Sequence, residues 1–381
     1  MNKTYKTDVL YVFGGGRKLK LQSNDNFGKE FFYGYVHLKN KGYSVDIIET
    51  TKQNISVLNS TILKLLERLL SKLTKLTFYL GALVSIKNLK KILSSRNIVS
   101  SNHGIGMTLF LFIGIFKLFK KINFIVINSG LFAMRKVNPV VKIARIFFLV
   151  LFLKTINYLI FTNRSEYEYA VKNFKNYSTK FVCLPFCIDT EFWKPTSNVV
   201  NYENKDGILF IGNNGHRDFK LVTKIAENLV EIPFTFITNQ IKDSEIKTNN
   251  VKNILGDWNA SHLSDIEVKK YYEEAKLVIL PINDTLVSSG QSAGLQAASV
   301  GTAVITTKTK GFWDYSNYVD NENIFFMDNN NLDEWLSKIK KIYSDDEKLK
   351  KIGSHSLKLI NDKYRLEIFN NELENLIENG K

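Results

Sequence analysis

The sequence has few cysteines and few prolines for its length. Its 381 residues include two cysteines, Cys183 and Cys187 on either side of Pro185, and five prolines. The two cysteines form neither a zinc-binding pattern nor a disulfide framework, and they fit a reducing, cytoplasmic compartment best. The low proline content and the lack of Ser/Gly tracts argue against long disordered segments. The length predicts about two folded domains.

Long apolar runs are also missing. No stretch of about 18 uncharged apolar residues occurs. The closest candidates, 105–119 and 146–161, are interrupted by Lys117 and Lys154. The apolar run after Asp8 is short and is typical of a strand rather than of a signal peptide. We therefore expect neither a membrane-spanning helix nor a cleaved leader.

Acidic residues are nearly absent from one section of the chain. Between Ser60 and Lys180 there are 20 Lys/Arg and three acids, a balance of +17, whereas the rest has 32 basic and 34 acidic residues, a balance of −2. The same section contains the apolar sequences TLFLFIGIFKLFKK and RIFFLVLFLK. Cations beside Leu and Phe are typical of a surface that binds anionic membranes. Nucleic acid fits less well because the spacing is helical, and core helices with lysines on their solvent faces remain the alternative.

Strand-like and helix-like segments alternate along the chain. In the first half, strands are predicted at 7–13, 43–49, 97–102, 123–129, 157–163 and 179–186, and a helix at 29–40. In the second half, they are predicted at 207–213, 233–239, 276–281 and 302–307. Short β-branched or aromatic runs separated by helices predict parallel sheets with helices on both faces.

The polar, aperiodic stretch 187–206 separates the two alternations. We therefore expect a Rossmann-like domain at 1–186, a linker at 187–206 and a second Rossmann-like domain at 207–363. A final helix at about 364–381 is expected to pack back on the first domain.

Two turns in the second half have the composition of phosphate-binding turns. FIGNNGHRDFK (210–220) and SSGQS (288–292) each lead from a strand into a helix. Glycine lets the backbone approach a ligand closely, and free N–H groups at a helix start favour an anion. We expect both helix starts to contribute to one diphosphate site. The alternatives are an ordinary strand-to-helix turn for the first and a small-residue helix packed on the sheet for the second.

Three segments, in this order, resemble the signatures of one enzyme family. PFCIDTEFWKP (185–195) is similar to the interdomain signature of family 4 glycosyltransferases of the GT-B fold. Residues 208–222 resemble the first strand and turn of their donor domain, and 276–316 resemble their donor-binding segment. The resemblance covers about 181–320 well and the first half weakly. It implies an α/β GT-B architecture, in which two doubly wound Rossmann-like domains face each other across a cleft.

The resemblance also implies a donor site that lacks two usual residues. The family's two glutamates, eight residues apart, correspond to Ser288 and Gln296. Gln296 can still accept a hydrogen bond from a ribose hydroxyl through its amide oxygen, whereas Ser288 lacks the carboxylate that contacts the donor sugar. The implied donor-binding residues are Gly212, Asn213, Arg217, Lys220, Gly290, Gln291, Ser292 and Gln296.

The implied catalytic residues are His103, Arg217 and Ser288. His103 follows strand 97–102, near where the family often has a histidine beside the donor sugar; a structural hydrogen-bonding role is the alternative. The acceptor-side residues are Gly15, Gly16 and Arg17, and Glu30, Asn128 and Glu166 are further candidates in the first half. No metal or cofactor is expected, because Arg/Lys and helix dipoles offset the charge of a leaving diphosphate.

The expected function is retaining, metal-independent transfer of a sugar from a nucleotide-sugar to a lipid-linked or glycan acceptor. The basic section places this activity at the cytoplasmic face of an anionic membrane, in surface polysaccharide or lipopolysaccharide biosynthesis, and no nucleic-acid partner is expected. One alternative is a non-catalytic GT-B-fold protein that binds a membrane or a partner. Another is a GT-B-fold sugar-nucleotide epimerase or hydrolase, which would use carboxylates that the donor segment lacks.

Overall fold

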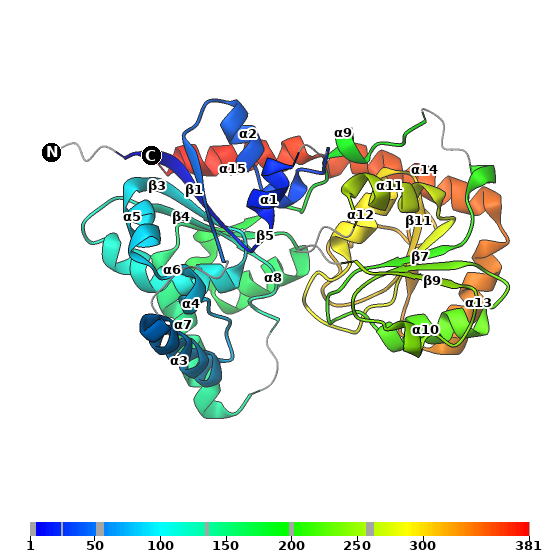
Figure 1. Cartoon of the computed structure of the whole chain (residues 1–381), viewed down its shortest axis with the longest axis horizontal. Helices are drawn as coiled ribbons and strands as arrows, with labels where there is room; N and C mark the ends of the chain where they lie inside the picture. The colour runs from blue at the N-terminus through cyan, green and yellow to red at the C-terminus, as the bar shows by residue number, and fades with distance from the viewer. Residues whose placement is uncertain are drawn as a thin grey trace. The chain divides into compact units, whose positions relative to one another are not determined.

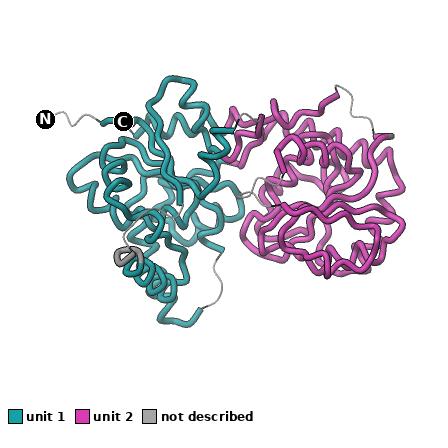
Figure 2. The backbone as a smooth tube through the Cα atoms, viewed as in Figure 1, with its two compact units in different colours: residues 1–24, 32–184, 369–381 teal, residues 25–31, 185–368 magenta. Residues whose placement is uncertain are grey.

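The chain forms two compact α/β units, drawn in teal and magenta in Figure 2. The first comprises residues 1–24, 32–184 and 369–381, and the second comprises residues 25–31 and 185–368. The structure, a computed structural model, describes residues 5–23, 26–50, 57–133, 137–197, 202–256 and 263–380. Each unit has a six-stranded parallel sheet surrounded by helices (Figure 1). The predicted α/β class with two doubly wound sheets is confirmed.

The sheet of the first unit has the strand order β2-β1-β3-β4-β5-β6. Its strands are β1 (Thr7–Phe13), β2 (Val45–Glu49), β3 (Ser95–Ser100), β4 (Asn123–Asn128), β5 (Tyr158–Phe161) and β6 (Phe181–Cys183). Every one overlaps a predicted strand, because a nearly continuous apolar run is what a strand buried on both faces requires. The central strands are fully covered, and Val9–Phe13 have no exposed surface.

Several helices of the first unit begin at side-chain caps. They are α1 (Arg17–Gln22), α2 (Tyr35–Asn40), α3 (Val57–Thr74), α4 (Leu80–Leu83), α5 (Ile86–Ser94), α6 (His103–Phe116), α7 (Pro139–Thr155), α8 (Arg164–Asn173) and most of α15 (Leu366–Asn379). Asn102, Asn138 and Asn163 cap α6, α7 and α8 by accepting backbone N–H groups, which fixes where each helix starts. Among the described residues, no helix is both long enough and apolar enough to cross a bilayer.

The predicted helix at 29–40 is instead two short pieces. A 3₁₀ turn, η1 (Glu30–Phe32), is followed by α2, and between them Tyr33 and Gly34 have φ values of 46° and 81°. These left-handed conformations break the helical hydrogen-bonding pattern. The break coincides with the point where the chain passes from the second unit into the first.

The sheet of the second unit has the order β12-β11-β10-β7-β8-β9. Its strands are β7 (Ile208–Ile211), β8 (Phe234–Ile237), β9 (Val251–Ile254), β10 (Leu277–Leu280), β11 (Ala303–Thr307) and β12 (Phe325–Met327). The four inner strands were predicted, and the two edge strands were not. Edge strands are covered on fewer sides, so a short or polar sequence such as VKNI (251–254) suffices there.

The helices of the second unit lie on both faces of its sheet. They are α9 (Thr190–Trp193), α10 (Phe219–Asn228), α11 (Asp265–Glu274), α12 (Gln291–Ser299), α13 (Leu332–Tyr343) and α14 (Asp346–Lys363). Figure 1 shows α10 and α13 on one face and α11 and α12 on the other. This arrangement places the start of α12, which follows β10, at the carboxyl edge of the sheet.

Part of the stretch expected to be a linker is packed into the second unit. Within 187–206, α9 buries Phe192 and Trp193, which are 7% and 1% exposed, and Ile188 pairs with Arg365. Residues 198–201 lie outside the described ranges. The polar composition of the stretch hid these few large anchoring side chains.

Candidate donor-binding site

The start of α12 has the geometry of an anion-binding helix N-terminus. Gly290 is its N-cap in a left-handed conformation (φ 79°), and glycine has no side chain that could accept an N–H group of the first turn. Its backbone N–H groups lie at the carboxyl edge of the sheet, where parallel α/β proteins bind ligands. The small residues also allow close packing, since a Cβ added to Gly294 would lie 2.9 Å from the Trp313 ring. Close packing of this helix is therefore observed, and anion binding at its start stays a prediction.

Two serine hydroxyls lie just before this helix. The Oγ atoms of Ser288 and Ser289 are buried and have no hydrogen-bond partner among the residues that the structure describes. Buried polar groups nearly always have a partner in native proteins. Both hydroxyls are therefore free to bond with a polar group at this position.

Backbone contacts bring the turn after β7 to this position. Arg217 pairs with Ile282, the Asp218 N–H donates to the Pro281 carbonyl at 2.9 Å, and the Asn283 N–H donates to the His216 carbonyl at 2.8 Å. Ile282 also lies beside Gly290, because a Cβ added to Gly290 would be 3.4 Å from Ile282 Cδ1. The turn is thus fixed next to the α12 start, and donor contact by Arg217 stays a prediction.

Arg217 is a buried cation at this site. It is 6% exposed, and its Nε atom has no hydrogen-bond partner within the described ranges. Burial lowers the pKa of Arg217 to about 10, and the nearby Tyr272 partly offsets this effect, so the side chain is charged at neutral pH. Gly212, with φ 132°, leaves room for it, since a Cβ there would lie 2.3 Å from Arg217 Cζ. The space beside Gly212 is therefore filled by the Arg217 side chain.

The expectation of a second free helix start is wrong. The Asp218 carboxylate caps α10 by accepting the Leu221 N–H at 3.1 Å. A capped N-terminus offers fewer donors, and a carboxylate there disfavours phosphate. Lys220 is exposed in the first turn of α10, so its contact with a donor stays a prediction. One helix start, that of α12, therefore remains as a candidate anion-binding group beside Arg217.

Asn213 connects the ends of three strands. Its Oδ1 accepts from Thr238 Oγ1 at 2.9 Å and from the Asn239 N–H at 2.7 Å, and its Nδ2 donates to the Gly256 carbonyl at 2.5 Å. Both ends of the amide are therefore engaged. The structure supports a role in shaping the turn, and donor contact by Asn213 stays a prediction, as it does for Gln291 and Ser292 in the first turn of α12.

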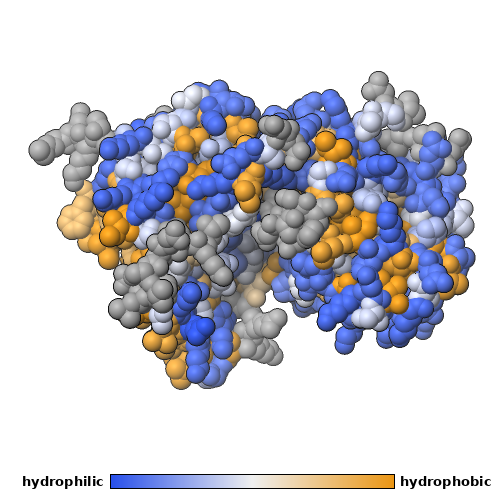
Figure 3. Space-filling view, viewed as in Figure 1, coloured by the Kyte–Doolittle hydropathy of each residue, from blue (hydrophilic) through white to orange (hydrophobic). Residues whose placement is uncertain are grey.

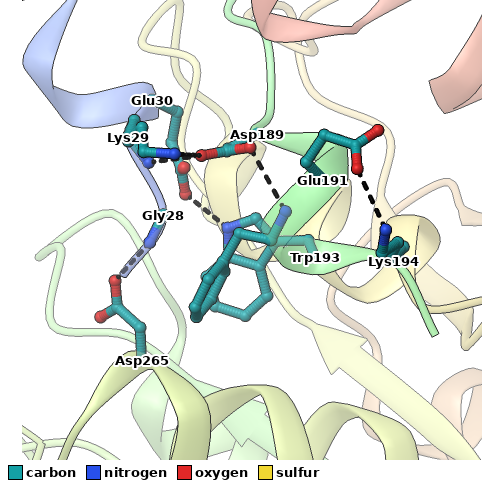
Figure 4. A network of polar contacts seen from close by, with 9 residues as sticks. Gly28, Lys29, Glu30, Asp189, Glu191, Trp193, Lys194 and Asp265 are labelled. Carbon is teal, nitrogen blue, oxygen red and sulfur yellow. Dashed lines mark hydrogen bonds and ion pairs between the residues drawn. The ribbon is translucent and has the colours of Figure 1, made fainter. Parts of the chain in front are cut away.

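Gln296 belongs to a buried polar chain that reaches Glu30. Gln296 is 8% exposed; its Oε1 accepts from Tyr272 Oη at 3.3 Å, and its Nε2 donates to Glu30 Oε1 at 2.9 Å. Trp193 Nε1 donates to the same Glu30 oxygen at 2.9 Å (Figure 4). Glu30 was expected in the first domain, but residues 25–31 belong to the second unit. No local sequence signal indicates such a long-range placement.

The first unit brings a second set of predicted residues to the carboxyl edge of its own sheet. His103 opens α6, and its Nδ1 lies 3.4 Å from Ser129 Oγ, just after β4. Burial lowers the pKa of His103 to about 4, so the imidazole is neutral at physiological pH. Sequence reasoning missed Ser129, although its place at the carboxyl end of the predicted strand 123–129 was a usable signal.

Glu166 shapes the loop that carries Ser129. Its carboxylate accepts the Phe132 N–H at 2.8 Å and the Gly130 N–H at 3.1 Å. Burial raises the pKa of Glu166 to about 7 against the effect of these hydrogen bonds. Glu166 is thereby a structural residue of this edge, and Asn128, which accepts the Leu131 N–H at 3.0 Å, is another.

The acceptor-side residues form the turn after β1. Gly16 has φ 92° and precedes α1, and Arg17 Nη1 donates to the Gly15 carbonyl at 3.1 Å. Burial lowers the pKa of Arg17, while Tyr33 and Glu49 act in the opposite direction. The turn is ordered in this way, and its contact with an acceptor stays a prediction.

No model of a known protein family matches the sequence, and no curated protein does either. Solved structures match over nearly the whole chain. A glycosyltransferase from Rickettsia africae has 11% identity and a TM-score of 0.65, covering 100% of this chain and 99% of its own. HepE from Anabaena, in complex with UDP and glucose, has 10% identity and a TM-score of 0.64, covering 98% and 99%. Sucrose-phosphate synthase from Thermosynechococcus elongatus has 12% identity and a TM-score of 0.65, covering 97% and 98%.

The chain has the GT-B glycosyltransferase fold. Identities of 10–12% establish this fold, and the activity of the site has to be argued from its residues. The predicted GT-B architecture is confirmed, while membership of family 4 and a retaining mechanism stay predictions.

Proposed function

We propose that the protein is a glycosyltransferase whose second unit binds a nucleotide-sugar through its diphosphate. The observation that carries this proposal is the buried, charged Arg217 fixed beside the start of α12, whose N-cap is a glycine. A cation and helical N–H groups together suit a diphosphate. In support, HepE from Anabaena has the same fold and was solved with UDP and with UDP-glucose.

The same groups suit the departure of the nucleoside diphosphate. As the bond to the sugar breaks, negative charge grows on the diphosphate, and fixed donors at that point lower the barrier. Arg217 and the α12 N–H groups are already in place, so little reorganisation is needed. A retaining, metal-independent transfer is part of this proposal.

In the first unit, we assign the acceptor to the edge formed by Arg17, His103 and Ser129. The neutral His103 can donate one hydrogen bond and accept another without carrying a charge. A hydroxyl group of a glycan needs this kind of partner. Glu166 keeps Ser129 in position through the loop after β4.

A membrane-associated acceptor is supported by the surface of α3 and α7, which pack against each other. Large apolar side chains on both helices are exposed by 37–69%: Ile62, Leu65, Leu66, Leu69, Leu73, Val140, Ile143, Ile146, Phe147 and Leu151. Figure 3 shows hydrophobic and hydrophilic side chains together at the end of the first unit where Figure 1 places these helices. Exposed Lys64, Arg68 and Lys72 flank the α3 residues. This mixture fits the cytoplasmic face of an anionic membrane and a lipid-linked or glycan acceptor of surface polysaccharide assembly.

A non-catalytic protein that binds membranes is the second candidate. Ser288 favours it, because this side chain offers a hydroxyl where the resembling enzymes use a carboxylate. Such a protein would keep the fold and the α3–α7 surface but would not turn over a donor.

Turnover of nucleotide-sugars separates the two candidates. We expect slow hydrolysis of at least one donor from a panel of UDP-, GDP- and ADP-sugars, measured as released nucleoside diphosphate. Transfer should accelerate when glycolipid extracts are added as acceptors. Neither hydrolysis nor binding with any donor would refute the enzyme proposal and favour the second candidate.

A further inference from the structure

Glu30 reaches the donor-binding unit from a distant part of the sequence. Residues 26–31 are attached to the second unit by several contacts. The Gly28 N–H donates to Asp265 at 3.1 Å and the Lys29 N–H donates to Asp189 at 3.2 Å (Figure 4). The centroid of the Phe31 ring lies 5.3 Å from that of Phe186. Gly28 also leaves room for the carboxylate, since a Cβ there would lie 2.5 Å from Glu30 Oε2. The segment therefore holds Glu30 in one place.

This carboxylate determines how the Gln296 amide is oriented. Glu30 Oε1 accepts two hydrogen bonds, one from Gln296 Nε2 and one from Trp193 Nε1, each at 2.9 Å. An oxygen that accepts from both groups carries no proton, so a proton bound by Glu30 lies on Oε2, and Oε1 faces the Nε2 of Gln296 in either ionisation state. The amide oxygen of Gln296 consequently points the other way, to the hydroxyl of Tyr272.

The orientation matters because Gln296 lies on α12, whose start forms the proposed diphosphate site. Arg217 and Tyr272 lie close enough that each shifts the pKa of the other. The oxygen of Gln296 faces Tyr272, and it has one lone pair left after accepting from the Tyr272 hydroxyl. An amide turned the other way would present N–H groups there and could not accept a hydrogen bond from a hydroxyl.

We propose that Glu30 is a positioning residue for donor binding, which fixes the Gln296 amide so that its oxygen accepts a hydrogen bond from a hydroxyl group of the nucleotide-sugar. This inference rests on the proposed function. It also accounts for glutamine at position 296, because a glutamate would place a second carboxylate against Glu30 in a buried environment.

The test is a double-mutant cycle on the KM of the donor, with kcat and thermal stability measured alongside. Glu30→Leu removes the acceptor, and we expect KM to rise about tenfold with a smaller change in kcat, as for loss of a binding contact. Gln296→Leu should raise KM by a similar factor. The E30L/Q296L double variant should have about the same KM as the Q296L single variant, because Glu30 acts only through Gln296.

Two further variants separate positioning from folding. Glu30→Gln keeps an oxygen for both donors and should keep KM within about twofold of wild type. Glu191→Gln, on α9 with a side chain 77% exposed, is the matched control and should change nothing.

Three results would overturn the inference. One is an unchanged KM in E30L when wild type turns over a donor, which leaves the proposed function standing. Another is that E30L raises KM by the same factor in the wild-type background and in the Q296L background. This result would show that Glu30 acts independently of Gln296, in a purely structural role. The third is a wild-type protein that neither binds nor hydrolyses any donor, which would refute the proposed function and this inference together.

Discussion

At the scale of single residues, the site depends on buried polar groups whose environments are unusual. Arg217 is a covered cation, His103 is held neutral by burial, and Glu30 and Glu166 are covered carboxyl groups. Covering such groups costs free energy, and that cost is tolerated where it prepares a site for a ligand. The proposed roles of these residues can be tested by single substitutions.

Gly212→Ala should weaken binding of a nucleoside diphosphate. The new Cβ would lie 2.3 Å from Arg217 Cζ, and φ is 132°, so the guanidinium has to move. We expect the Kd for UDP to rise about tenfold, as for loss of a charged hydrogen bond. Titration calorimetry measures this, and Gly215→Ala, where a Cβ would meet open space, is the control. Equal affinities for both variants would contradict the assigned place of Arg217.

The pH dependence of stability should reveal Glu30. Burial raises the pKa of Glu30 to about 7, above its ordinary value, so the folded protein binds a proton that the unfolded chain has released. The stabilisation is full below the unfolded pKa and is lost as the pH rises through about 7. From pH 5 to 8, wild type should lose roughly 2–3 kcal/mol of unfolding free energy relative to Glu30→Gln. Parallel urea-unfolding profiles of the two proteins would contradict this.

At the scale of secondary-structure elements, the segments that follow parallel strands carry the predicted chemistry. Gly290 at the start of α12, Arg217 after β7 and His103 after β3 all lie at carboxyl edges of the sheets. The loop after β4 is held differently, by Glu166 of α8. Elements thus set where a residue lies, and specific hydrogen bonds set how it points.

Glu166→Gln should destabilise the loop after β4. The two carboxylate oxygens each accept one backbone N–H. The amide of a glutamine has only one oxygen, so its NH₂ group would face one of these two backbone N–H donors. We expect a loss of about 1–3 kcal/mol in unfolding free energy. Denaturant unfolding of E166Q and of Glu168→Gln, whose side chain is 67% exposed on the same helix, provides the comparison. A loss of the same size in the control would contradict the role of Glu166.

The elements were also the level at which the sequence was most informative. Buried strands such as 7–13 and 302–307 are apolar runs, and such runs can be recognised in the sequence without knowing which strands lie beside them. The anchoring of Trp193 and the passage of Glu30 into the second unit depend on contacts between residues 163 positions apart. No periodicity indicates such contacts, so the sequence did not predict the packing of α9 within the stretch 187–206, and the predicted single helix at 29–40 was partly wrong.

At the scale of the whole molecule, charge and exposed apolar surface are concentrated in one part of the chain. The section 60–180, with its balance of +17, lies in the first unit and includes α3 and α7. Glu67, one of the three acids in this section, accepts the Gly81 N–H at 3.0 Å and therefore has a structural hydrogen bond within the first unit. The surface therefore suits an anionic lipid layer.

Replacing two leucines of this surface should reduce membrane binding. Leu65 and Leu69 are 63% and 59% exposed, so L65E/L69E should preserve the fold while adding two negative charges. We expect wild type to sediment with vesicles of phosphatidylcholine and phosphatidylserine at low salt, and the variant to sediment at least several-fold less. The L255E/I266E variant, at sites 54% and 53% exposed in the second unit, should behave as wild type. Equal sedimentation of all three proteins would contradict the membrane proposal.

The central claim is that the second unit holds a nucleoside diphosphate between Arg217 and the start of α12. Titration calorimetry of UDP, GDP and ADP into wild type, Arg217→Gln and Lys224→Gln tests it most directly, since Lys224 is an exposed cation on α10. We predict micromolar to millimolar binding of at least one nucleotide by wild type and by K224Q, with a Kd at least about tenfold higher in R217Q. Binding that is equally strong in R217Q, or no binding of any of the three nucleotides by wild type, would contradict the account.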